Sequence, residues 1–417
     1  MRILKALPLL LVAVVALAAC SNAATSSSTA QSMTPSSMAP MSMAPESMAP
    51  DGVVVDSDAA NLRVDLDYLL GEHLILAAKA TGAALDARND QFAAYGELLN
   101  TNGTELGAAI GSIYGTDAED EWNRIWSAHN GFFVDYTTGV ATDDMAMSDK
   151  AVEDLTTVYV PEFSAFLAGA TGLPEDAVTD LVTDHVLQTK AVVDAQASGD
   201  FEAAYAAIRA AYAHMQMIGD ALAPAIAEGN DIQGDASNAG VDLRVALDQL
   251  LQEHLYLASF ATDAAIGGRS DEFAAAGAAL NTNGTDLGAA IGSLYGTEAE
   301  DSFNQIWSAH NGFFVDYTTG VATDDQAMMD KAVEDLTTVY LPDFAEFLAG
   351  ATDLPQDALE GLIQDHVLTT KAIVDAQGAG DIAAAAAADR EAAMHMRMIG
   401  DPLAAAIVAK LPDQFAS

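Results

Sequence analysis

The sequence contains a single cysteine, so a disulfide bond within the chain cannot form. Positive charge is also scarce, since 16 Lys and Arg residues stand against 61 Asp and Glu residues and give a net charge of −45. Nucleic-acid binding needs a clustered basic patch, and none is visible, so nucleic acid is not an expected partner. The simplest interpretation of the acidity is solubility or adaptation to salt, although such a surface also attracts cations weakly.

Signatures of several enzyme classes are missing as well. The chain has no Gly-x-Ser-x-Gly, no His-Glu-x-x-His and no glycine-rich phosphate loop, and the single cysteine leaves no haem attachment motif. Carboxylate-bridged di-iron bundles use paired Glu-x-x-His motifs, whereas here one glutamate, Glu391, lies four residues before a histidine, and its counterpart is Ala210. These gaps argue against a hydrolase, a phosphate-binding enzyme and a di-iron oxidase.

The first nineteen residues resemble a bacterial lipoprotein signal. Arg2 and Lys5 precede a short apolar run, and Leu17-Ala18-Ala19-Cys20 matches the lipoprotein cleavage site. We therefore expect lipid modification of Cys20, an extracytoplasmic location and a membrane anchor supplied by lipid, because the apolar run is too short to span a bilayer comfortably.

Residues 20–57 are predicted to form a flexible tether, because their Ser, Ala, Thr, Pro and Met content shows no apolar period. Methionine recurs in this segment without a packing role, and thioethers are soft ligands suited to Cu(I). Repeat expansion explains these methionines equally well. The possible auxiliary metal ligands are Met38, Met41, Met43 and Met48.

The rest of the chain is a duplication. The sequence IWSAHNGFFVDYTTGVATDD at Ile125–Asp144 occurs again, unchanged, at Ile306–Asp325, an offset of 181 positions. Helical periodicity with Gly, Pro and Asp punctuation predicts about six helices in each copy, and Pro161 is expected to kink one of them. No strand-like alternation of useful length appears, and aromatic residues are only 7% of this alanine-rich chain. We predict an all-α protein with two tandem helical-bundle domains, at 58–232 and 239–417.

Histidine occurs only in two matched sets of four. Each member lies on the apolar stripe of its predicted helix, as in Leu66, Leu69, His73 and Leu76, so all are predicted to point inward. The pairs related by the offset are His73 and His254, His129 and His310, His185 and His366, and His214 and His395.

Four inward histidines on four helices suggest a metal site, because a buried imidazole without a partner costs about 1–3 kcal/mol and imidazole is the commonest metal ligand. Met217 and Met398 each follow a histidine by three residues and are predicted to share its face. A set of histidine and methionine ligands favours copper. Another transition metal, two separate histidine pairs, or satisfied core histidines without metal remain open.

The motifs LRxxLDxLLxEH, LNTNGTxLGAAIGSxYG, WSAHNGFFVDYT and HMxMIGDxL occur in both repeats. They resemble a bacterial extracytoplasmic helical-repeat family of unassigned function, some of whose members carry a copper-amine-oxidase label. The chain lacks the Asn-Tyr-Asp/Glu signature from which such oxidases make their quinone cofactor, so oxidase activity is not carried over.

The sequence thus predicts a lipid-anchored metal-binding protein that scavenges, buffers or delivers copper, with no protein partner indicated. The alternatives are a non-catalytic surface spacer or interaction module and a metal-dependent redox enzyme.

Overall fold

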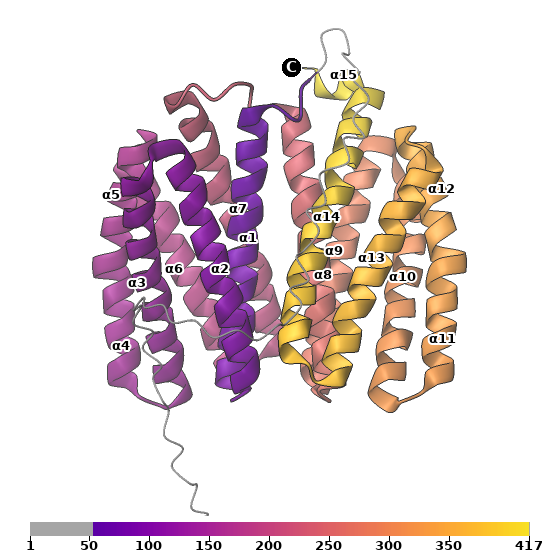
Figure 1. Cartoon of the computed structure of the whole chain (residues 1–417), viewed down its shortest axis with the longest axis horizontal. Helices are drawn as coiled ribbons and strands as arrows, with labels where there is room; N and C mark the ends of the chain where they lie inside the picture. Colours follow the sequence, from indigo (N-terminus) through magenta and orange to yellow (C-terminus); the bar gives the residue numbers. More distant parts are fainter. Residues whose placement is uncertain (1–52, 417) are drawn as a thin grey trace, which may run out of the picture. The chain divides into compact units, whose positions relative to one another are not determined.

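Two sets of helices, one from each copy of the duplication, make up the computed structural model, which describes residues 53–416 (Figure 1). No strand occurs within that range, so the predicted all-α class is confirmed. The predicted signal at 1–19, Cys20 and the methionines Met38, Met41, Met43 and Met48 lie outside the described residues.

The first repeat contains six helical segments when the interrupted fourth one is counted once. Their bounds are α1 Asp58–Leu85, α2 Asn89–Tyr114, α3 Thr116–Ala141, α4 Met145–Asp154 continuing into α5 Val160–Thr171, α6 Glu175–Ser198 and α7 Phe201–Gly229.

The second repeat follows the same plan and adds a short terminal helix. Its helices are α8 Ala239–Ile266, α9 Ser270–Tyr295, α10 Thr297–Thr323, α11 Gln326–Asp335 continuing into α12 Leu341–Thr352, α13 Gln356–Ala379, α14 Ile382–Lys410 and α15 Pro412–Phe415. Aspartates cap corresponding helices in both repeats, as Asp200 and Asp381 accept hydrogen bonds from the third residues of α7 and α14.

A π-helical turn interrupts the fourth helix of each repeat, at Leu155–Tyr159 and Leu336–Tyr340. Within the first turn the Val160 N–H donates to the Leu155 carbonyl, a five-residue step. In a regular α-helix the Pro161 ring would clash with the carbonyl four residues earlier, and proline has no N–H to donate to that carbonyl. The predicted kink at Pro161 therefore takes the form of a wider, π-helical turn.

The two repeats pack against each other through their first helices. α1 contacts α8, and the flanking contacts are reciprocal, with α7 on α9 and α14 on α2. Small apolar side chains let the α1 and α8 backbones approach closely, namely Ala60 and Val64 against Val241 and Val245. Both repeats belong to one compact unit; whether each one folds by itself, as the predicted division at 232–239 implies, stays a prediction.

Arginines from each repeat reach carboxylates of the other. Arg209 on α7 forms a bidentate pair with Glu253 on α8, at 2.9 and 3.0 Å. Arg390 on α14 does the same with Glu72 on α1, at 3.0 and 3.1 Å. Since Glu72 and Glu253 immediately precede the first histidines of their repeats, these pairs fix the helices that carry those histidines.

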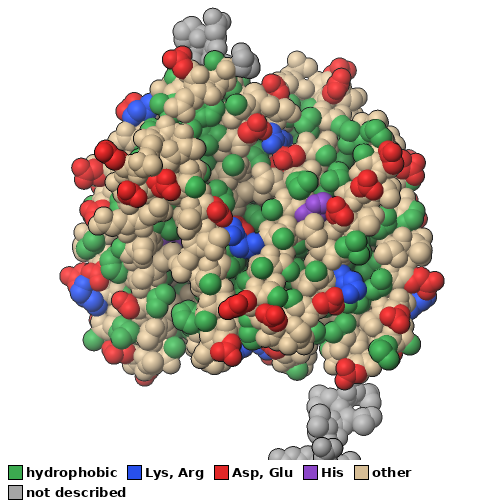
Figure 2. Space-filling model, turned by 180° about the vertical axis from the view of Figure 1, so that it is seen from behind, with side chains coloured by type: hydrophobic (Ala, Val, Ile, Leu, Met, Phe, Trp, Pro, Cys, Tyr) green, Lys and Arg blue, Asp and Glu red, His purple; other side chains and the backbone are tan. Residues whose placement is uncertain are grey.

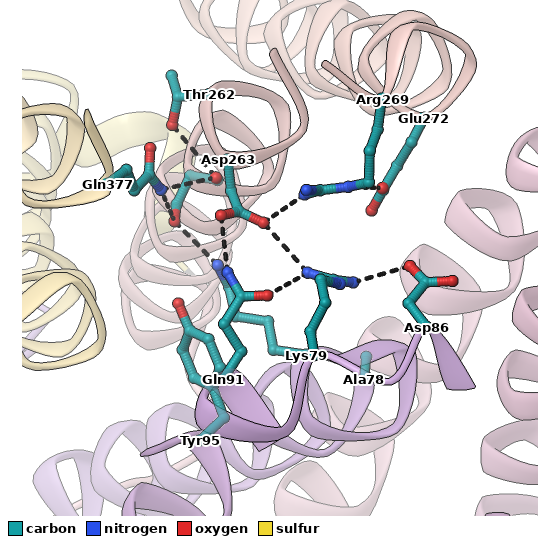
Figure 3. A network of polar contacts seen from close by, with 12 residues as sticks. Ala78, Lys79, Asp86, Gln91, Tyr95, Thr262, Asp263, Arg269, Glu272 and Gln377 are labelled. Carbon is teal, nitrogen blue, oxygen red and sulfur yellow. Dashed lines mark hydrogen bonds and ion pairs between the residues drawn. The ribbon is translucent and has the colours of Figure 1, made fainter. Parts of the chain in front are cut away.

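A buried polar network lies beside the same interface and breaks the symmetry between the repeats. Lys79 on α1 pairs with Asp389 on α14 at 2.9 Å, and both side chains are buried. Figure 3 shows this region, in which Asp263 of α8 accepts hydrogen bonds from Gln91 at 2.8 Å and from Arg269 at 2.5 Å.

Figure 2 shows carboxylates spread over one face of the molecule, with few basic groups among them. None of the helices between residues 53 and 416 combines the length and apolar character that a membrane crossing requires.

Candidate metal centres

Three histidines from three helices meet inside the first repeat. His73 on α1, His129 on α3 and His185 on α6 each offer one ring nitrogen, and these nitrogens lie within 4.8 Å of one another. All three side chains are buried, with 1–4% of their surface exposed. We call this group triad 1.

The second repeat builds the same group from α8, α10 and α13. Triad 2 consists of His254, His310 and His366, again with ligand nitrogens within 4.8 Å. Its ring centroids are 5.5, 6.2 and 5.5 Å apart, against 5.7, 6.0 and 5.4 Å for the matching pairs of triad 1. Both repeats therefore arrange their three histidines in the same way.

Aromatic rings hold the imidazoles in place. In triad 1 the Trp126 ring lies 4.6 Å from that of His73, and the Tyr159 ring stacks on His129 at 4.3 Å. In triad 2 the matching contacts come from Trp307 at 4.6 Å and Tyr340 at 4.4 Å. These contacts limit the rotation of His73 and His129 in triad 1 and of His254 and His310 in triad 2.

The two tyrosines are residues that the sequence prediction missed. Tyr159 ends the π-helical turn before Pro161, so the extra residue of that turn sets which way its ring faces. One available signal was the segment LTTVY, which is identical in both repeats at 155–159 and 336–340.

Each triad histidine has a ring nitrogen that no described residue satisfies. These buried atoms are Nδ1 of His73, His129, His254 and His310, and Nε2 of His185, His310 and His366. Proteins seldom leave buried polar atoms without partners, because each one costs about 1–3 kcal/mol. All three converging imidazoles of both triads carry such a nitrogen, which points to a ligand that the three rings share.

Burial keeps the imidazoles neutral. Burial, together with a neighbouring imidazole, lowers the pKa of His73 and of His185 to about 3. In triad 2 burial likewise lowers the pKa of His254 to about 3, and that of His310 and His366 well below its usual range. Neutral imidazole is the form that binds metals, so protons compete little with a metal at neutral pH.

The dimensions of the triads suit a small transition-metal ion. Atoms no more than 4.8 Å apart lie within about 2.8 Å of a common centre, and a metal–imidazole bond measures roughly 2.0–2.1 Å. An inward shift of less than about 1 Å per ring therefore completes the coordination. Each triad could hold one metal ion, and its donor set contains no carboxylate.

The fourth predicted histidine of each repeat lies near its triad but bonds to backbone. Nε2 of His214 lies 2.9 Å from the Leu181 carbonyl oxygen, and Nε2 of His395 lies 3.0 Å from that of Leu362. The proximity of His214 nevertheless contributes to the lowered pKa of His185. Neither histidine belongs to a converging triad, so we place His214 and His395 beside the triads, each with Nε2 held by a backbone carbonyl.

The predicted methionine ligands lie away from the buried triads. Met217 and Met398 have 56% and 57% of their surface exposed. A three-residue step turns a helix through about 300°, which leaves the second residue roughly 60° from the first. That angle carries these side chains from the buried stripe to the solvent side.

Stability of the metal-free protein is expected to fall as the pH drops below about 6.5. Unfolded histidine takes up a proton near that pH, whereas burial and a neighbouring imidazole hold the folded pKa of His73 and His254 at about 3. Protonation thus favours the unfolded chain between the two values. Replacing both with phenylalanine should reduce the pH slope of the unfolding free energy, by about 1.4 kcal/mol per pH unit for each histidine near pH 5 and by less toward pH 7.

Denaturant unfolding of the parent and of the double variant, between pH 5 and 7, measures this difference. Burial raises the pKa of Asp67 and Asp248 well above the usual value, and a raised carboxyl pKa contributes a slope of the opposite sign. Because both proteins contain these aspartates, their contribution cancels in the comparison. Equal slopes for the two proteins would contradict neutral triads.

Comparisons of the chain with profiles of protein families, with curated proteins and with solved structures found no match.

Proposed function

We propose that this protein binds two transition-metal ions, one in each triad, and that its physiological cargo is copper held as Cu(I) for scavenging, buffering or delivery. One observation carries the proposal: in both repeats three buried, neutral imidazoles converge with unpartnered nitrogens. A metal bound by the three imidazoles would add its binding energy to folding.

The charge of the site favours Cu(I). No carboxylate belongs to either triad, so the full charge of the ion is carried into a buried region. The cost of burying charge rises with its square, which makes a monovalent ion much cheaper to bury than a divalent one. Magnesium, calcium and manganese prefer oxygen ligands, while imidazole suits copper and zinc. Zinc is therefore the competitor that any test must include.

The sequence supports a location on the outer side of the membrane, where a protein that scavenges or delivers copper would work. The lipoprotein signal and Cys20 favour a mature chain anchored by lipid on the outer side of the membrane. The tether would let the helical repeats move above the surface. A net charge of −45 would raise the local concentration of cations near the protein.

Titration of the metal-free chain tests the proposal. With Cu(I) supplied from a chromophoric chelator under reducing, anaerobic conditions, we expect two equivalents bound per chain and a higher melting temperature. At free metal a hundredfold above Kd, each occupied site should stabilise the folded state by about 2.7 kcal/mol. A parallel titration with Zn(II) is expected to show weaker binding. Protein that takes up neither metal and melts unchanged would contradict the proposal and favour a spacer.

A further inference from the structure

A cavity of about 90 Å³ adjoins triad 2. It lies among α8, α9, α10 and α13, and the buried rings of His254 and His310 form part of its wall. Val315 and Thr319, also in its wall, are exposed on α10. The cavity therefore connects the surface to two of the three histidines. By this measure one water needs roughly 10–15 Å³, so several water-sized molecules fit.

The cavity wall carries no charged group. Apolar side chains supply most of it, including Leu255, Phe273, Leu280 and Phe314. Its polar members besides the histidines are neutral threonines and Asn311. An ion would lose its hydration here without compensation, whereas a small uncharged molecule would not. The wall thus selects against anions such as phosphate or carboxylates.

The same wall is encoded twice. Every residue that lines this cavity has a residue of the same type 181 positions earlier, from His73 and Ala77 through Phe92 and Leu99 to Thr189. This holds although seven of the fifteen positions between Ala83 and Glu97 differ from their counterparts. Phe92 lies inside that divergent segment and is still matched by Phe273.

Three protein ligands leave a transition metal with an open coordination position, which is the arrangement of metal sites that bind exogenous ligands. We infer that this cavity delivers a small uncharged ligand, of the size and polarity of carbon monoxide or dioxygen, to the open position of a metal in triad 2, and that the matching residues beside triad 1 do so there. The inference rests on the proposed function, because the ligand needs a bound metal.

Carbon monoxide is the probe for the Cu(I)-loaded full-length protein, since it forms a dative bond to Cu(I) and its stretching band reports each bound molecule. We expect two bound molecules per chain with two copper ions. Ala258→Phe, which places a ring in the cavity beside triad 2, should reduce this to one molecule while two copper ions remain. The matched variant Ala77→Phe should do the same for triad 1, and the double variant should bind none.

Metal content measured in the same samples separates this inference from the proposed function. Two copper ions with no bound carbon monoxide, or two molecules bound in the Ala77→Phe/Ala258→Phe double variant, would overturn the inference and leave the copper site standing. Protein without copper would overturn both. If the phenylalanine variants fail to fold, xenon-pressurised crystals of the unaltered protein decide instead. A xenon peak between Phe273 and His254 supports the cavity as a ligand site, and its absence overturns it.

Discussion

His129→Phe is expected to remove one of the two copper ions and leave the other in place. His129 stacks on Tyr159 at 4.3 Å, and a phenyl ring keeps that contact while it removes the ligand nitrogen. Losing one of three ligands should weaken binding at triad 1 at least about 100-fold, which corresponds to about 2.7 kcal/mol. His310→Phe should empty triad 2 in the same way, and the double variant should bind no copper in the competition titration.

Three further variants serve as controls for that result. Met217→Ala and Met398→Ala remove exposed side chains and should leave the stoichiometry at two. His214→Gln keeps a donor for the Leu181 carbonyl and should retain both ions, with affinity at triad 1 reduced no more than about tenfold. Copper loss in the methionine variants, or full occupancy in the His129→Phe/His310→Phe double variant, would rule out the triads as the binding sites.

Asp389→Ala is expected to lower the free energy of unfolding by about 3–5 kcal/mol, because it leaves the charge of Lys79 buried without a partner. Asp389 is fully buried and accepts hydrogen bonds from Lys79 at 2.9 Å, from Tyr95 at 2.6 Å and from Ser259. Denaturant unfolding of the metal-free protein measures the loss.

The positions related to this pair by the duplication supply the control for this prediction. The positions equivalent to Lys79 and Asp389 are Phe260 and Ile208, which belong to one buried hydrophobic cluster, so apolar side chains replace the ion pair there. Lys79→Met combined with Asp389→Leu should recover most of the stability lost in Asp389→Ala. A cost below about 1 kcal/mol for the single variant would show that the Lys79 ammonium reaches water when its partner is removed.

Periodicity was enough to predict much of this architecture. The apolar stripes through His73, His129 and His185 gave the correct side of each helix, because burial follows the 3.6-residue period directly. The same reasoning predicted that His214 points inward, and the His214 side chain is buried. Periodicity gives the direction of a side chain around a helix but not its height along the bundle. It therefore could not separate three histidines that meet from a fourth that bonds to the Leu181 carbonyl.

Other features depend on contacts between distant segments. The ring of Tyr159 reaches His129 through a π-helical turn, a local change in winding that no apolar pattern specifies. The pairing of Arg390 with Glu72 joins residues 318 positions apart. Other carboxylates lie closer to Arg390 along the sequence than Glu72 does. The contact of Arg390 with the other repeat therefore could not be predicted.

Anomalous diffraction from crystals grown with Cu(I) tests the central claim most directly. We predict two copper peaks per chain, each bonded to three histidine nitrogens at about 2.0 Å, one among His73, His129 and His185 and the other among His254, His310 and His366. Copper peaks only at surface carboxylates or at Met217 and Met398, with both triads empty, would contradict it.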